Sequence, residues 1–144
     1  MQASDIKGVA VIGARTMGHG IGQEFAMAGY DVVFHDESHE SLRTVKERIS
    51  RNLGELIEWG LAEEGQVEPT LDWIRTASDL EEAGAKADLV IETVFENLEV
   101  KQEVSRRLDA ACPQHTIVAS NTSSLMPSML AAATSRPDQV LVSH

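Results

Sequence analysis

The stretch VIGARTMGHG, residues 11–20, joins an apolar run to a segment with helical spacing. Residues 8–13 (GVAVIG) are short and apolar, which fits a buried strand. Apolar residues of 17–28 recur at helical intervals, and Gly29 is placed to end that helix. Arg15 stands where a G-x-G-x-x-G turn has its second glycine. The stretch is therefore either a phosphate-binding turn with one unusual residue or an ordinary strand–turn–helix.

The rest of the chain repeats this alternation. Further short apolar runs, expected to be strands, cover 32–36, 73–76, 88–94, 116–119 and 139–143. Segments of helical period cover 38–57, with Ser38 as N-cap, 98–111 and 124–133, whereas 60–70 is a mixture of helix fragments and loop. Apolar strands alternating with amphipathic helices indicate a parallel sheet covered on both faces. We therefore predict an α/β fold, a doubly wound parallel-sheet Rossmann domain of strand order 3-2-1-4-5-6, with a long helical segment inserted after the second strand.

Composition argues against several classes of function. The 144 residues fit one domain, and 23 acidic against 12 basic side chains give a net charge of -11. A negative charge opposes binding to nucleic acids and anionic membranes. Cys112 is the only cysteine, which excludes an internal disulfide and a cysteine-based zinc site. With no apolar run near the roughly 18 residues of a membrane span and no signal-peptide pattern in MQASDIKG, we expect a cytoplasmic protein.

The turn has the chemistry of a dinucleotide site. A first glycine at position 13 permits a tight turn, and Gly18 permits close packing of helix on strand. Free amides around Thr16 and Met17, with the positive end of the helix, could then hold a pyrophosphate. Asp36 ends the next expected strand, where a carboxylate accepts ribose hydroxyls and repels a 2′-phosphate. The pattern predicts NAD rather than NADP; the alternative is an ordinary turn in which Asp36 caps a helix.

Arg15 admits three interpretations. Its β-carbon could crowd the pyrophosphate, or its guanidinium could point outward and pair with phosphate. A role in binding a 2′-phosphate is opposed by Asp36. We expect a tolerated arginine that modulates affinity. His19 is expected to be a surface or capping side chain, and His35 and His39 have no partner that the sequence identifies.

Two further stretches complete a pattern. They are DLVIETVFENLEVKQEV, residues 88–104, and ASNTSSL, residues 119–125, followed by RPDQVLVSH, residues 136–144. Together with VIGARTMGHGI and VVFHD, they resemble the L-3-hydroxyacyl-CoA dehydrogenase family over nearly the whole chain. The resemblance implies an oxidoreductase of fatty acid metabolism that uses NAD to oxidise a 3-hydroxyacyl-CoA to the 3-ketoacyl-CoA. Residues 1–144 would be its NAD-binding domain.

The resemblance also implies roles for individual residues. The cofactor would be held by Gly13, Arg15, Thr16, Met17, Gly18, Asp36, Glu96, Lys101, Asn121 and Ser123. Ser123 would help to polarise the substrate oxygen, and His144 would be the catalytic base, for which an imidazole suits neutral pH. From the residues alone, Lys101 could instead form a surface salt bridge, and Asn121 and Ser123 could cap the helix expected at 124–133.

The chain departs from the family pattern in two respects. The glutamate that orients the catalytic histidine and the C-terminal domain for substrate binding and dimerisation are expected to be absent from residues 1–144. A serine and a lysine that help to hold the CoA correspond here to Asn52 and Trp59, and only Asn52 could still hydrogen-bond a substrate. An acyl-CoA substrate and a homodimeric complete protein remain the expectation, with no metal. The alternatives are a dehydrogenase of a non-CoA 3-hydroxy acid and a non-catalytic NAD-binding module.

Overall fold

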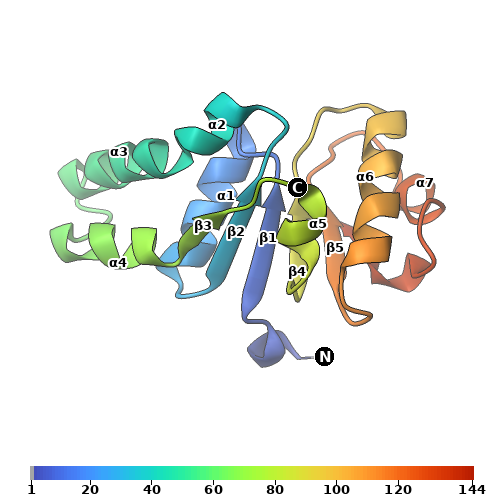
Figure 1. Ribbon diagram of the computed structural model, residues 1–144. Helices are drawn as coiled ribbons and strands as arrows, with labels where there is room; N and C mark the ends of the chain where they lie inside the picture. Colours follow the sequence, from blue (N-terminus) through green and yellow to red (C-terminus); the bar gives the residue numbers. More distant parts are fainter. Residues whose placement is uncertain (1) are drawn as a thin grey trace.

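The computed structural model describes residues 2–144 and contains one six-stranded parallel sheet (Figure 1). Its strand order, β3-β2-β1-β4-β5-β6, is the order that the sequence predicted. The strands are β1 (Gly8–Ile12), β2 (Asp31–His35), β3 (Ile74–Thr76), β4 (Leu89–Glu92), β5 (Ile117–Ser120) and β6 (Val140–Val142). Because the order reverses between β1 and β4, the connections leave a crevice at the carboxyl ends of these two strands.

Helices connect the strands. They are α1 (Thr16–Met27), α2 (His39–Arg43), α3 (Val45–Glu58), α4 (Val67–Asp72), α5 (Leu80–Gly84), α6 (Leu98–Ala111) and α7 (Pro127–Ala131). Short 3-10 turns occupy Ala3–Asp5 (η1), Glu64–Gln66 (η2) and Pro137–Gln139 (η3). Helix α6 has the bounds that the apolar spacing predicted. No helix among residues 2–144 is both long and apolar enough to cross a membrane.

Two helix predictions were wrong in detail. The single helix expected over 38–57 is two helices that break at Thr44, whose hydroxyl donates to the Glu40 carbonyl at 2.8 Å. Such back-bonding bends helices. Ser38 is the N-cap of the first of them, since its hydroxyl accepts from Ser41 N at 3.2 Å. The helix expected over 124–133 begins only at Pro127, whose ring suits a first helical turn.

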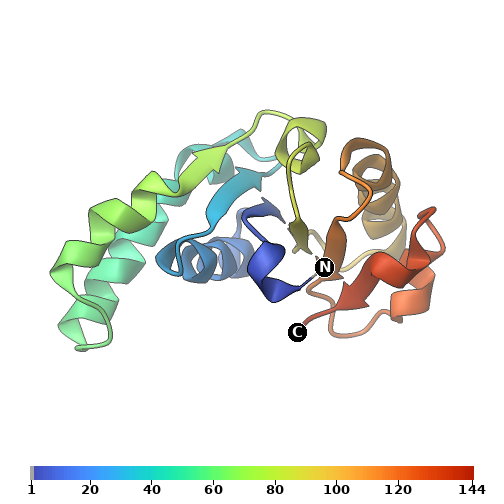
Figure 2. The ribbon, with the colours of Figure 1, turned by 90° about the horizontal axis from the view of Figure 1, so that it is seen from below.

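The strands alternate their side chains between two cores, one on each face of the sheet. On β1, Val9 and Val11 point to the face covered by α1 and α3, while Ala10 and Ile12 point to the face covered by α5 and α6. Figure 2, which looks along the sheet from below, shows these helices on opposite sides of the strands. Burial on both faces explains why the strands read as continuous apolar runs rather than alternating ones.

Candidate functional site

The turn between β1 and α1 requires the two glycines that it has. Gly13 adopts φ +104°, a backbone conformation that residues with a β-carbon rarely take. A β-carbon on Gly18 would lie 1.7 Å from the carbonyl oxygen of Gly13, so only glycine lets the first turn of α1 pack against the end of β1. Thr93 closes the turn from the neighbouring strand end, because its hydroxyl donates to the Gly13 carbonyl at 2.8 Å.

Arg15 is compatible with this backbone. Its φ is -82°, so the position does not require glycine for conformational reasons. Its exposed side chain turns toward the loop after β4, where the guanidinium carbon lies 4.9 Å from the centre of the Phe95 ring. This is the distance of a cation–π contact. The guanidinium thus lies over the Phe95 ring, and the effect of Arg15 on NAD affinity stays a prediction.

The peptide groups beside Arg15 are held on both sides by ionic groups. Asp36 accepts a hydrogen bond from Ala14 N at 2.7 Å through one carboxylate oxygen and from Ser38 N at 2.7 Å through the other. Arg48, on α3, donates from one terminal nitrogen to the Ala14 carbonyl at 2.6 Å and to the Ser41 carbonyl at 2.7 Å. Because both hydrogen-bonding groups of Ala14 are occupied, the orientation of the following amide is fixed. Sequence reasoning missed Arg48, since 34 residues separate it from Ala14.

An apolar cleft opens beside this turn, at the carboxyl ends of β1 and β2. Its volume is about 480 Å³, and its apolar wall consists of Ile12, Leu80, Val94, Phe95, Val100 and Val104. Asp36 and Arg15 lie at its polar side, next to the glycine turn. Binding sites for cofactors are concave, mostly apolar and edged by a few polar groups. The sequence identified the polar edge, whereas the apolar wall could not be distinguished from ordinary core residues.

Ion pairs cross one end of the apolar cleft. Arg107 of α6 holds Glu81 of α5 through two hydrogen bonds of 2.7 and 2.8 Å, and its guanidinium also lies 3.7 Å from Glu37, which follows β2. The hydrogen bond from Arg107 lowers the pKa of Glu81 to about 2. These charges therefore join three elements around the cleft.

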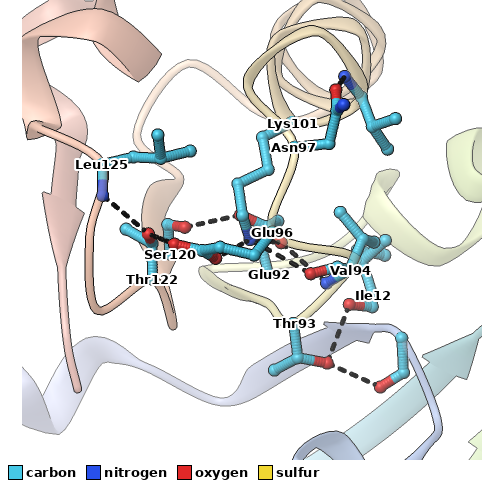
Figure 3. A network of polar contacts seen from close by, with 12 residues as sticks. Ile12, Glu92, Thr93, Val94, Glu96, Asn97, Lys101, Ser120, Thr122 and Leu125 are labelled. Atoms are coloured by element: carbon cyan, nitrogen blue, oxygen red, sulfur yellow. Dashed lines mark hydrogen bonds and ion pairs between the residues drawn. The ribbon is translucent and has the colours of Figure 1, made fainter.

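Lys101 is buried, so the surface salt bridge offered as one interpretation of it is wrong. Its side chain is 1% exposed, and its ammonium lies 2.8 Å from Glu92 Oε1 (Figure 3). It also donates to the Val94 carbonyl at 3.2 Å. The charge of the lysine is thus paired with Glu92 inside the protein, and its place in the cofactor site stays a prediction. The same Glu92 accepts from Val94 N at 2.7 Å and, through Oε2, from Ser120 Oγ at 2.5 Å.

Glu96 joins the loop after β4 to the loop after β5. Its Oε1 accepts a hydrogen bond from the Thr122 hydroxyl (Figure 3). The same oxygen accepts a second hydrogen bond, at 2.7 Å, from the Ser124 hydroxyl. Its other oxygen lies 3.5 Å from the Lys101 ammonium. The hydrogen bond from Thr122, with that from Ser124, lowers the pKa of Glu96 to about 2. Sequence reasoning found Glu96 but missed Glu92, although a charged residue inside the apolar strand DLVIETV was a usable signal.

The other predicted residues lie along the same edge of the sheet. Asn121 follows β5, and its backbone amide donates to the Glu92 carbonyl at 2.8 Å. Ser123 and His144 are exposed, and neither side chain makes a hydrogen bond or ion pair within residues 2–144. Capping of α7 by Asn121 and Ser123 is wrong, because the helix starts at Pro127. His144 follows β6, which runs parallel to β5 and therefore ends at the same edge.

Asn52 lies in a second, polar depression, which we name the α3 groove. Arg15, Arg48, Arg51 and His19 are among its lining residues. His19 is braced there, since its Nδ1 lies 2.7 Å from the carbonyl oxygen of Arg15. Trp59 ends α3 and is 68% exposed. Three arginines and one glutamate, Glu40, are among the lining residues, so the groove is net positive on a chain whose net charge is -11.

Known proteins are similar to this chain in both sequence and fold. The family model described as "3-hydroxyacyl-CoA dehydrogenase, NAD binding domain" matches residues 8–144. A probable 3-hydroxybutyryl-CoA dehydrogenase of Bacillus subtilis is 41% identical over 140 residues, which are 97% of this chain and 48% of that protein. FadB2 of M. tuberculosis has a TM-score of 0.91 at 33% identity, over 96% of this chain and 49% of that one.

A third similar protein is (S)-3-hydroxybutyryl-CoA dehydrogenase PaaH1 from Ralstonia eutropha, with a TM-score of 0.86 at 34% identity, over 93% of this chain and 47% of that one. The chain spans about half the length of the relatives that it matches. The family match covers the glycine turn and all six strands, because it runs from the first residue of β1 to residue 144. The chain therefore belongs to the 3-hydroxyacyl-CoA dehydrogenase family, as its NAD-binding domain, and its cofactor is NAD.

Proposed function

We propose that the full-length protein oxidises a 3-hydroxyacyl-CoA to the 3-ketoacyl-CoA and that residues 1–144 bind its NAD. One observation carries the cofactor half of this proposal. The glycine turn, fixed by Asp36 and Arg48, lies at the edge of an apolar cleft at the point where the strand order reverses. NAD supplies the hydride acceptor. The chain supplies a turn of free amides for the pyrophosphate, the Asp36 carboxylate for the adenosine ribose, and the apolar cleft for the adenine.

The part of the proposal that concerns the substrate depends on residues at the carboxyl ends of β5 and β6. Ser123 and His144 are exposed there and have no partner within the described part of the chain, so both are free to meet a ligand. In this proposal, Ser123 donates to the substrate oxygen and His144 accepts the hydroxyl proton while hydride leaves the same carbon. Asn121 and Glu96 line the nicotinamide side of the site. An imidazole is suited to the proton transfer because its ordinary pKa lies near neutral pH.

The α3 groove supports a CoA thioester over a non-CoA hydroxy acid. The phosphates of CoA need cations, and Trp59 supplies none. Arg15, Arg48 and Arg51 lie in the same groove as Asn52. Arg51 precedes Asn52 directly, Arg48 lies about one helical turn before it, and Arg15 comes from the glycine turn. We propose that Asn52 and these arginines replace the missing lysine in holding the substrate's phosphates.

Two experiments test the proposal. Calorimetric titration of the 144-residue chain with NADH should give saturable binding, whereas NADPH should bind much more weakly because Asp36 repels its 2′-phosphate. Asp36→Asn should reduce the difference between the two dinucleotides. Failure of a folded chain to bind either one would contradict the assignment of the cleft.

The second experiment uses the full-length protein with a panel of substrates. NAD reduction with 3-hydroxybutyryl-CoA, and little with free 3-hydroxybutyrate, supports the proposal. The reverse preference indicates a dehydrogenase of non-CoA acids, and NADH binding without turnover of any substrate indicates a non-catalytic module. The homodimer, the C-terminal domain and the cytoplasmic location stay predictions.

A further inference from the structure

His35 presents a buried nitrogen that has no partner. It is the last residue of β2, is 5% exposed, and lines the apolar cleft. Its Nδ1 lies 3.3 Å from the carbonyl oxygen of Ala77, which can only accept a hydrogen bond, so Nδ1 carries the proton. In the neutral ring Nε2 is then an acceptor, and within residues 2–144 nothing donates to it. Buried polar atoms left unpaired are uncommon because their desolvation is not compensated.

The charged groups around His35 do not satisfy this nitrogen. Glu37 Oε1 lies 4.0 Å from Nε2, beyond hydrogen-bond distance, and a carboxylate would be a second acceptor. Arg107 is occupied by Glu81 and Glu37. The Glu37 side chain is 87% exposed and free to turn away into solvent. What fits Nε2 of the neutral ring is therefore an N–H donor. Because Nε2 itself is buried, such a donor reaches it from the cleft only after a covering side chain such as Glu37 turns aside.

We infer that His35 selects the base of the dinucleotide by accepting a hydrogen bond from the exocyclic amino group of adenine. The inference rests on the proposed binding of NAD in this cleft. Asp36, which holds the ribose in that proposal, is the next residue after His35, so the base attached to that ribose lies against the neighbouring apolar wall. Adenine offers an amino group where hypoxanthine and guanine carry a carbonyl oxygen. An oxygen there would face the Nε2 lone pair without a proton between them.

The test compares two dinucleotides on the 144-residue chain. In reduced nicotinamide hypoxanthine dinucleotide, the amino group at position 6 of the NADH base is replaced by a carbonyl oxygen, and the adjacent N1 gains a proton. Calorimetry measures the affinity of the chain for both dinucleotides. The unmodified chain should bind NADH at least about tenfold more tightly, which corresponds to the loss of one hydrogen bond with an acceptor left unpaired. His35→Phe should reduce the preference to within about twofold. His35→Gln, which keeps an acceptor, should restore part of it.

His39→Phe is the matched control, because His39 is exposed at the start of α2 and does not line the cleft. It should keep the full preference for NADH. Equal binding of both dinucleotides by the unmodified chain, or an undiminished preference in His35→Phe, overturns the inference while leaving NAD binding intact. No binding of either dinucleotide to the folded chain overturns the cofactor cleft itself, and the inference with it.

Discussion

Lys101 and Glu92 form an ion pair of 2.8 Å in which the side chains are 1% and 3% exposed. Removing one partner leaves a buried charge unpaired, so Lys101→Met should lower the free energy of unfolding by about 3–5 kcal/mol. Urea denaturation followed by circular dichroism measures the change. Arg106→Met, on the same helix, removes an exposed pair with Glu103 and should change stability by less than about 1 kcal/mol. Equal decreases in the free energy of unfolding for the two variants would show that burial of the ion pair does not determine how much stability is lost.

Gly18 and Gly20 are both in the first turns of α1 but have different surroundings. Gly18→Ala should abolish detectable NADH binding, because its β-carbon would meet the Gly13 carbonyl at 1.7 Å and the turn would have to shift. A β-carbon at Gly20 meets nothing within 4 Å, so Gly20→Ala should raise the melting temperature slightly, since alanine favours a helix interior over glycine by about 1 kcal/mol. Calorimetric titration measures the NADH affinity of both variants, and thermal unfolding measures their melting temperatures. NADH binding by Gly18→Ala at the original affinity would contradict it.

Arg48 fixes the carbonyl of Ala14 although it lies on α3. Arg48→Met should weaken NADH binding about tenfold or more, because the amides of the glycine turn lose a fixed orientation and a charge-assisted hydrogen bond is worth about 1.5–3 kcal/mol. The affinity is measured by calorimetry. Arg43→Met, which removes only an exposed pair with Glu40 on α2, should leave the affinity unchanged. The prediction is wrong if both variants bind NADH alike.

Arg15 stands at the position of the turn's second glycine, and its guanidinium lies over the Phe95 ring. Arg15→Gly should weaken NADH binding by only about two- to fivefold, because an exposed cation contributes about 0.2–1 kcal/mol to an ionic contact. The loss should shrink at high salt, which screens exposed charges. Arg15→Lys, which keeps the charge, should retain most of the affinity. Tighter binding by Arg15→Gly would instead mean that the β-carbon crowds the pyrophosphate.

Glu96 should remain ionised to unusually low pH. The hydrogen bond from Thr122 is the largest contribution that lowers its pKa from 4.5 to about 2. A pKa depressed in the folded state stabilises that state above pH 4.5, and the contribution is lost as the pH falls from 4.5 toward 2. Thr122→Val should raise the pKa of Glu96 toward 4.5, as measured by NMR titration of its side-chain carboxyl carbon. Ser123→Ala should not, because this exposed hydroxyl makes no hydrogen bond within residues 2–144.

The order of the strands and the polar edge of the cofactor site followed from local patterns. Apolar runs separated by helical periods specify a doubly wound sheet, and such a sheet brings the turn at Gly13 and the strand end at Asp36 together. The end of α6 and the Ser38 cap were also predictable, because capping and helical spacing act over a few residues. The break at Thr44 was not, since a threonine hydroxyl inside a helical pattern does not reveal whether it will bond the carbonyl of the preceding turn, as it does here to Glu40.

The sequence by itself determined the architecture, the glycines that the turn requires and the identity of the cofactor as NAD, because each depends on residues that are close in the chain or on the order of the elements. Tertiary structure alone decided that Lys101 is buried against Glu92, that Arg48 holds Ala14 from 34 residues away, and that His35 lines the cleft with a free nitrogen. The charge of a lysine and the reach of an arginine are visible in a sequence. Their burial and their partners depend on which surfaces the folded chain brings into contact. Burial and partners together determine how much each charged group contributes to stability and what role it has.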